Sequence, residues 1–308
     1  MAADPTAVLP DPIEFGARTD ISARSVLVTI FGDSVVPAGG EIWLGDLIDL
    51  VDQFGFSERL VRTSMFRLGT EGWFEVERVG RRSRYRLTPW AMGEFAAAET
   101  RIYGVSSAWD GLWTLVLVDA ASGPAAFTRA GAEAARAVLA ERGFAPVAPG
   151  VLAAPRADPD AVAGWLRGAG AIGTVPIARA RFHDVAGLAG TGWPASAFDL
   201  EPVAQRYGSV VGTYGPLAAA AAGDPGGLDM GDESAFALRT MLVHELRRAR
   251  LGDPELPLEA LPAAWPGPGA VATASAVYHA VAEPAERWLA KVTGLVVDPA
   301  VTACRLGG

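Results

Sequence analysis

The chain has 308 residues, of which 50% are hydrophobic, so it can supply the cores of two or three domains. Its net charge of −9 argues against indiscriminate attraction to nucleic acid or anionic lipid, and no apolar run is long enough to span a membrane. One cysteine, Cys304, excludes a disulfide framework and a cysteine-based zinc cluster, and we expect a cytoplasmic protein without a metal site or cofactor.

Residues 1–20 contain three prolines and four acids, and they lack the basic start and apolar core of a secretory signal. We therefore expect them to form a flexible arm. In the rest of the chain, helical patterns with alanine-rich faces alternate with short Val and Leu runs, which predicts the α+β class.

The segment SVLVTIFGDS, residues 25–34, resembles the nucleophile block of the GDS-type lipases and esterases. That family also carries an Asp-x-x-His pair and an oxyanion-hole Asn, because a nucleophilic serine needs a base and oxyanion donors. This chain has no Asn, and none of its three histidines follows an Asp at that spacing. The alternative is structural: a first helix begins near Ser22, ends around Gly32 and Ser34, and opens a loop through Gly40.

Two helices are predicted after this loop. Residues 41–54 place apolar side chains at three- and four-residue spacing, and Gly55 ends that pattern. Ser57 then suits the N-cap of a second helix, whose Val61, Met65 and Leu68 form a buried stripe. The opposite side of this second helix carries four polar or aromatic residues, with Arg67 at its margin: Arg59, Arg62, Thr63 and Phe66.

A basic hairpin is predicted next, with strands WFEVERV and SRYRL joined by Gly80, Arg81 and Arg82. Residues 57–88 hold eight arginines and four acids, a net charge of +4, so the remainder carries −13. Residues 21–88 thus fit a winged helix-turn-helix that binds double-stranded DNA, although the four acids could instead pair with the arginines on a solvated face. The predicted DNA contacts are Ser57, Arg59, Arg62, Thr63, Ser64, Phe66, Arg67, Arg81, Arg82 and Arg84.

The segments FGDS, GGEIWLG, FGFSERLVRTS and GRRSRYRLT together resemble the N-terminal domain of the PaaX-type repressors. Residues 242–267, LVHELRRARLGDPELPLEALPAAWPG, are similar to a block of that family's C-terminal domain. The resemblance implies a homodimeric repressor of phenylacetate or related aromatic catabolism, without enzyme activity, that leaves an inverted-repeat operator when an aryl-CoA thioester such as phenylacetyl-CoA binds. Phe66 departs from the small or polar residue expected there, so no base preference is transferred.

The middle of the chain changes pattern. Thr88 and Pro89 open a connecting helix, residues 89–105, and residues 106–182 read as strand, helix, two strands, helix and strand. This order predicts a ferredoxin-like βαββαβ domain. The family resemblance implies that it helps the dimer form and is similar to a small ferredoxin-like nuclease of CRISPR systems, in which an aspartate at the position of Asp119 binds metal; a turn or cap is the alternative role.

Residues 183–308 are predicted to form a mostly helical C-terminal domain. His244, Arg247 and Arg248 fall on one helix face, where arginines could bind CoA phosphates or a carboxylate. The alternative is a structural polar network. The full predicted effector site comprises Arg181, His183, Trp193, Tyr207, His244, Arg247 and Arg248.

The sequence thus predicts a dimeric transcriptional repressor with no catalytic activity. The alternatives are a metal-dependent nuclease built around Asp119, a GDS-type esterase, or a protein-interaction module whose basic face meets an acidic partner.

Overall fold

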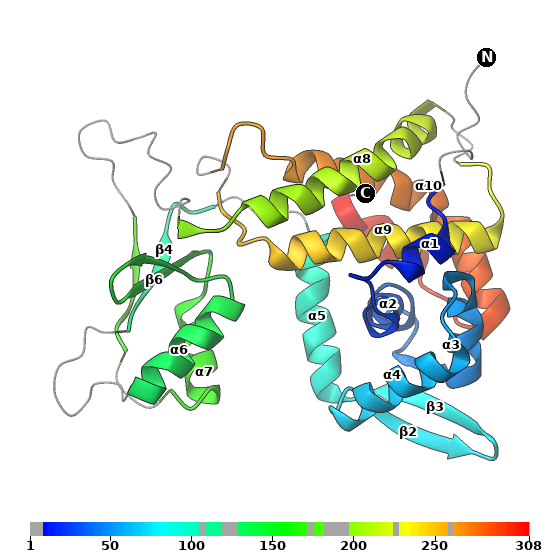
Figure 1. Cartoon of the computed structure of the whole chain (residues 1–308), viewed down its shortest axis with the longest axis horizontal. Coiled ribbons are helices and arrows are strands. Elements are labelled where there is room, and N and C mark those ends of the chain that lie inside the picture. The colour runs from blue at the N-terminus through cyan, green and yellow to red at the C-terminus, as the bar shows by residue number, and fades with distance from the viewer. Residues whose placement is uncertain are drawn as a thin grey trace. The chain divides into compact units, whose positions relative to one another are not determined.

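The computed structural model describes residues 9–104, 109–118, 129–171, 175–181, 197–223, 228–257 and 261–307 (Figure 1). The chain forms two compact units. The first comprises Met1–Val105, Ala204–Leu251 and Pro266–Gly308, and the second comprises Ser106–Val203 and Gly252–Trp265. The C-terminal helices therefore pack with the N-terminal region in the first unit, whereas the sequence predicts a separate C-terminal domain.

The first unit opens with short helices around a small antiparallel sheet whose strand order is β1-β3-β2. Ser22, Ser57 and Thr88 accept hydrogen bonds from backbone N–H groups and cap three of the helices, as predicted. The elements are α1 (Pro12–Ala17), α2 (Ala23–Ile30), the π-helical turn η2 (Phe31–Val35), β1 (Glu41–Trp43), α3 (Leu44–Val51), the 3-10 turn η3 (Asp52–Phe54), α4 (Glu58–Thr70), β2 (Phe74–Val79), β3 (Arg82–Leu87) and α5 (Pro89–Tyr103).

Two expectations for this region are wrong. Residues 41–43, predicted as helix, form β1 because Ile42 pairs with Tyr85 and extends the hairpin sheet. Residues 12–17, predicted as flexible, form α1, which Asp11 caps with its side chain. Phe15 of α1 is buried and lies 5.4 Å from the ring of His244, so apolar packing orders this part of the arm.

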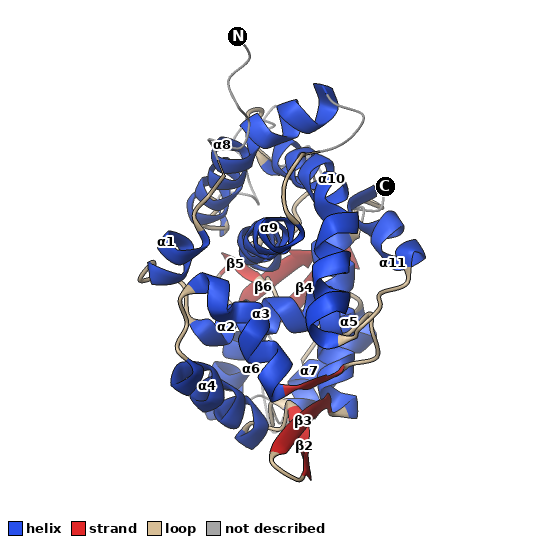
Figure 2. Ribbon diagram, turned by 90° about the vertical axis from the view of Figure 1, so that its right-hand side faces the viewer, coloured by secondary structure: helices blue, strands red, loops and turns tan. Residues whose placement is uncertain are grey.

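Long helices complete the first unit, with α9 at its centre, seen nearly end-on in Figure 2. Every residue from Ala235 to Leu246 of α9 is buried, as expected for a helix packed on all sides. Helix α8 continues through Pro216 without a break in its helical assignment. The C-terminal elements are α8 (Glu201–Gly223), α9 (Asp232–Gly252), α10 (Gly267–Thr293), α11 (Pro299–Cys304) and the 3-10 turn η6 (Arg305–Gly307).

The second unit contains a four-stranded antiparallel sheet with the order β5-β6-β4-β7. Helices α6 and α7 bury Leu139 and Val162 against Val116 and Leu152 on one face of the sheet. Trp113, Ala153 and Leu256 form a smaller cluster elsewhere in the unit. The elements are β4 (Trp113–Leu117), α6 (Arg129–Glu141), β5 (Ala145–Ala148), β6 (Val151–Pro155), α7 (Pro159–Gly168) and β7 (Ile177–Ala180). Helices and antiparallel sheets in both units confirm the α+β class.

Candidate nucleic-acid interface

Helix α4 presents one face to the protein interior and the other to solvent. Val61, Met65 and Leu68 are fully buried, and α4 packs on α2 and α3, as the predicted stripe requires. Figures 1 and 2 show α4 and the β2–β3 hairpin at the end of the first unit opposite α8. The apolar stripe therefore fixes which residues of α4 remain available to a partner.

The exposed face of α4 carries most of the residues predicted to bind DNA. Ser57, Arg59, Arg62, Thr63, Phe66 and Arg67 are exposed, and 68% of the Phe66 surface is accessible. Thr63 Oγ1 donates to the carbonyl of Arg59 at 2.8 Å. Ser64, which was also predicted to contact DNA, does not lie on this face. It is on the buried side of α4 and is only 7% exposed.

The arginines of the hairpin sheet are largely paired with carboxylates. Arg82 donates to Asp46 at 3.0 Å and lies 4.4 Å from the ring of Trp43. Arg84 pairs with Glu77 at 2.5 Å and with Glu41 at 3.3 Å. These contacts hold the side chains of β3 in defined positions and partly neutralise them.

A second group of arginines is not engaged in this way. Within the described residues, Arg59, Arg67 and Arg81 make no ion pair or hydrogen bond through their guanidinium groups, whereas Arg62 pairs with Glu58 at 2.6 Å. Arg81 lies in the tight turn of the hairpin, next to Gly80, whose φ of 62° suits glycine. These free cations are available to phosphate oxygens without first breaking an internal contact.

The predicted effector residues are not brought together as one open pocket. Arg181, in the second unit, is exposed and donates to the carbonyl of Asp110 at 2.8 Å. His183 and Trp193 lie outside the described residues, and Tyr207 on α8 is only 1% exposed.

His244, Arg247 and Arg248 do share a stretch of α9, but each already contacts the N-terminal region. His244 Nδ1 lies 3.0 Å from Thr29 Oγ1, and burial lowers the pKa of this histidine to about 3. Arg247 donates to Thr29 Oγ1 at 2.8 Å and to the carbonyl of Ser25 at 3.0 Å, and burial lowers its pKa to about 10. The set therefore resembles the predicted structural alternative, a polar network that joins α9 to α2.

Arg248 extends this network to the segment before α2. Its Nη1 donates to Asp20 Oδ2 at 2.7 Å, and Arg18 donates to the same carboxylate at 3.0 Å. Hydrogen bonds from Arg248 and Arg18 lower the pKa of Asp20 to about 2. Asp20 thus stays ionised and bridges two guanidinium groups.

A buried ionic cluster that the sequence patterns do not predict surrounds Asp33, the central residue of the GDS segment. Asp33 accepts from Arg239 Nε at 2.7 Å, from Arg305 Nη1 at 3.1 Å and from the Tyr103 hydroxyl at 2.7 Å. Asp33, Arg239 and Arg305 are each 2% exposed. The cluster joins the end of α2 to α5, α9 and the C-terminal turn. The sequence feature that could have indicated this cluster is the presence of Arg239 and Arg305 in otherwise apolar segments.

Electrostatics keep this cluster ionised. Burial alone would raise the pKa of Asp33, but the positive charges of Arg239 and Arg305 lower it below its ordinary value. Arg305 also pairs with Glu99 of α5 at 3.0 Å. Ser34 is 2% exposed, and its hydroxyl oxygen lies 3.4 Å from Oδ2 of Asp33. The hydroxyl is therefore not presented at the surface as a nucleophile would be.

No site for a metal ion is evident in the described part of the chain, where no group of three His, Cys, Asp or Glu residues converges. Asp119 lies outside the described residues. None of the helices within those ranges is long and apolar enough to cross a membrane.

Comparison with known proteins places these features in a family. The profile described as PaaX-like protein matches residues 22–90, and the PaaX-like protein C-terminal domain matches residues 198–291. The transcriptional repressor PaaX of Escherichia coli strain K12 is 33% identical over 272 residues, which cover 85% of this chain and 81% of the relative. The chain belongs to the PaaX family. The resemblance drawn from the sequence motifs is therefore confirmed.

A solved structure also resembles this PaaX-family chain. It is the uncharacterized protein Rv0674 from Mycobacterium tuberculosis, which is 23% identical; the match covers 85% of this chain and 98% of that one, with a TM-score of 0.49. At this level the likeness says nothing about function. The family assignment rests on the sequence matches, whose first segment contains the whole of α4 and the hairpin.

Proposed function

We propose that this chain is a transcriptional repressor that binds double-stranded DNA through α4 and the β2–β3 hairpin. The observation that carries the proposal is the exposed arginine-rich face of α4, next to the basic hairpin, in a chain whose curated relative is a repressor. Helices α2 to α4 with the sheet β1-β3-β2 suit a winged helix-turn-helix. In that arrangement α4 enters the major groove and Arg81 approaches the backbone.

The proposal assigns different roles to the exposed residues. The free guanidinium groups of Arg59, Arg67 and Arg81 contact phosphates, while Arg62, Thr63 and Phe66 face base edges, where the phenyl ring could meet a thymine methyl group. Arg82 and Arg84 are held by carboxylates, so they contact DNA by exchanging these exposed ion pairs for phosphate contacts. Ser57 caps the helix and adds a contact at its N-terminus.

The repressor is proposed to act as a homodimer on an inverted repeat, since two related reading heads match two half-sites. The strand order β5-β6-β4-β7 with two helices on one face supports a ferredoxin-like arrangement for the second unit. We assign dimerisation to this unit and no catalytic role.

Release from DNA is proposed to follow binding of an aryl-CoA thioester such as phenylacetyl-CoA, with Arg247 and Arg248 of α9 as its contacts. An anion that reaches Arg247 must replace hydrogen bonds to Ser25 and Thr29, which join α9 to α2. Because α4 packs on α2, such a change could alter the DNA-binding face. A hundredfold loss of DNA affinity requires a coupling of about 2.7 kcal/mol.

The test is fluorescence anisotropy with DNA from upstream of the protein's own gene, at several stated salt concentrations. Parent protein should bind one fragment specifically, and phenylacetyl-CoA, but not free phenylacetate, should reverse binding. Alanine at Arg59, Arg67 or Arg81 should each reduce the slope of log affinity against log salt by about 0.9. Arg167→Ala, an exposed arginine of the second unit, is the matched charge control.

The outcomes separate the parts of the proposal. Absence of any sequence preference would contradict the repressor function. Specific binding that the thioester does not reverse would contradict only the effector class. Alanine variants of Arg247 and Arg248 that are released normally would move the effector site elsewhere.

A further inference from the structure

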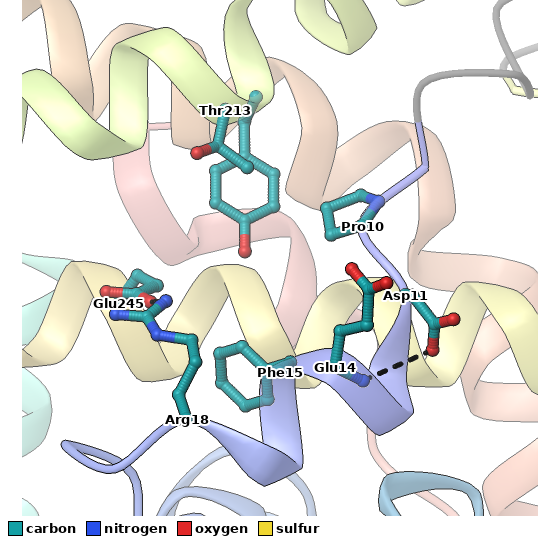
Figure 3. Close-up of a pocket in the computed structure, with 8 residues that line it drawn as sticks. Pro10, Asp11, Glu14, Phe15, Arg18, Thr213 and Glu245 are labelled. Atoms are coloured by element: carbon teal, nitrogen blue, oxygen red, sulfur yellow. Dashed lines mark hydrogen bonds and ion pairs between the residues drawn. The ribbon is translucent and has the colours of Figure 1, made fainter.

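A small pocket lies between α1, α8 and α9, within the first unit (Figure 3). Its volume is about 260 Å³, near the lower limit for small-molecule sites. Apolar surface comes from Pro10, Phe15 and the ring of Tyr214, and polar groups come from α1, α8 and α9. None of the residues that line it belongs to the DNA-binding face or to the predicted effector site.

The charges around this pocket are predominantly negative. Asp11, Glu14 and Glu245 each contribute a carboxylate, and Arg18 contributes the one guanidinium among the lining residues. Arg18 is already committed, because it pairs with Glu245 and with Asp20. Figure 3 shows Arg18 beside Glu245, with Glu14 on the other side of Phe15. An anion would therefore meet unfavourable charge and no free cation.

Two of the three carboxylates have defined structural roles, and the third has none. Asp11 caps α1 by accepting from the N–H of Ile13 at 2.7 Å, and Glu245 pairs with Arg18. In the described residues the Glu14 side chain makes no hydrogen bond or ion pair. Glu14 is thus free to bind a cation that enters the pocket.

Tyr214 supplies an independent sign of a ligand. Its side chain is 1% exposed and lines the pocket, yet its hydroxyl makes no hydrogen bond to any residue in the described ranges. Burial raises the pKa of this phenol, and the negative charge of Glu245 raises it further, so the hydroxyl stays protonated. A hydroxyl that lines a pocket without a protein partner can form a hydrogen bond with a molecule that enters the pocket.

We propose that this pocket binds a small organic ammonium ion, a protonated amine carried on a single apolar ring or short chain. The ammonium group would donate to Glu14 and to the oxygen of Tyr214, and the apolar body would lie on Phe15 and Pro10. The ring of Phe15 already accepts a cation, since the Arg18 guanidinium lies 5.9 Å from its centroid. This site goes beyond the proposed repressor function and does not depend on it.

The experiment is a calorimetric titration of the full-length protein with benzylamine at pH 7, where the amine is protonated, and with sodium benzoate as an anion of similar size. Benzylamine should bind one site saturably and benzoate should not. Glu14→Gln should weaken binding about tenfold, and Tyr214→Phe should also weaken it, because each removes one partner of the ammonium group. Glu94→Gln on α5 is the control for loss of a negative charge and should bind like the parent.

Both pocket variants should fold, because Glu14 is exposed and Phe keeps the ring of Tyr214; their melting temperatures check this. The proposal is overturned if benzylamine shows no saturable binding up to about 10 mM. This concentration would occupy about nine-tenths of a site whose Kd is about 1 mM. It is equally overturned if benzoate binds as well as benzylamine, or if Glu14→Gln binds like the parent.

Discussion

Two groups of arginine–carboxylate contacts in the first unit differ in what surrounds them. Around Asp33 the partners are almost completely buried, and each charge is held by several hydrogen bonds. On the face proposed to bind DNA, Arg62–Glu58 and Arg84–Glu77 are pairs in which at least one partner is about half exposed. Water can replace a lost partner in the second group but not in the first.

This difference in burial suggests that the two groups of arginine–carboxylate pairs have different structural roles. The buried cluster holds α2, α5, α9 and the C-terminal turn in one arrangement, because no member can leave without stranding a charge. The exposed pairs can be exchanged for phosphate contacts at little cost. We infer that the first group fixes the position of the DNA-binding elements and that the second group supplies adjustable charge.

The largest expected effect is on folding stability. Asp33→Ala leaves Arg239 and Arg305 without their shared carboxylate and should lower the free energy of unfolding by about 3–5 kcal/mol. Urea unfolding followed by circular dichroism measures it. Glu77→Gln, which breaks an exposed pair with Arg84, should leave the midpoint unchanged. Equal effects of the two variants would remove the distinction between buried and exposed pairs.

A pH-dependent effect of about 2 kcal/mol is expected from His244, another buried group in the first unit. Its folded pKa of about 3 lies below the unfolded value of about 6.5, so the unfolded chain binds one more proton between these values. The contribution of His244 to the free energy of unfolding is therefore fully present above pH 6.5. It decreases by about 1.4 kcal/mol for each pH unit below that value. Urea unfolding between pH 6.5 and 5 should show this slope, and His244→Gln should flatten it. An unchanged slope in the variant would refute the assignment.

A double-mutant cycle gives a finer comparison. Glu99 on α5 pairs with Arg305, and its side chain is 34% exposed. Alanine at both positions should show a coupling energy of about 1 kcal/mol, because the pair is only partly screened by solvent. The same cycle on Glu58 and Arg62 should give about 0.3–0.5 kcal/mol. If the exposed pair couples as strongly as the partly buried pair, solvent access does not explain the difference.

Sequence patterns predicted the local elements well because their causes are local. The buried stripe of α4, its Ser57 cap and the hairpin turn at Gly80 all depend on residues within a few positions. The cluster around Asp33 could not be predicted, since Asp33 and Arg305 are separated by 272 positions and meet only through packing. The helix α1 was missed for a related reason: prolines and acids suggested disorder, whereas distant α9 supplies the surface that buries Phe15.

The smallest expected effect concerns DNA affinity and tests whether exposed pairs are adjustable. Glu58 holds Arg62 at 2.6 Å and places a negative charge on the face proposed to meet DNA. Glu58→Gln should therefore tighten operator binding about two- to fivefold, because a repelling charge is removed and Arg62 is freed for its base contact, and the salt slope should change by less than one phosphate contact. Anisotropy against salt measures both quantities, and Glu233→Gln at the start of α9 serves as the charge control. Weaker binding by Glu58→Gln would mean that the ion pair positions Arg62 for recognition, so this arginine would belong with the fixed contacts rather than the adjustable ones.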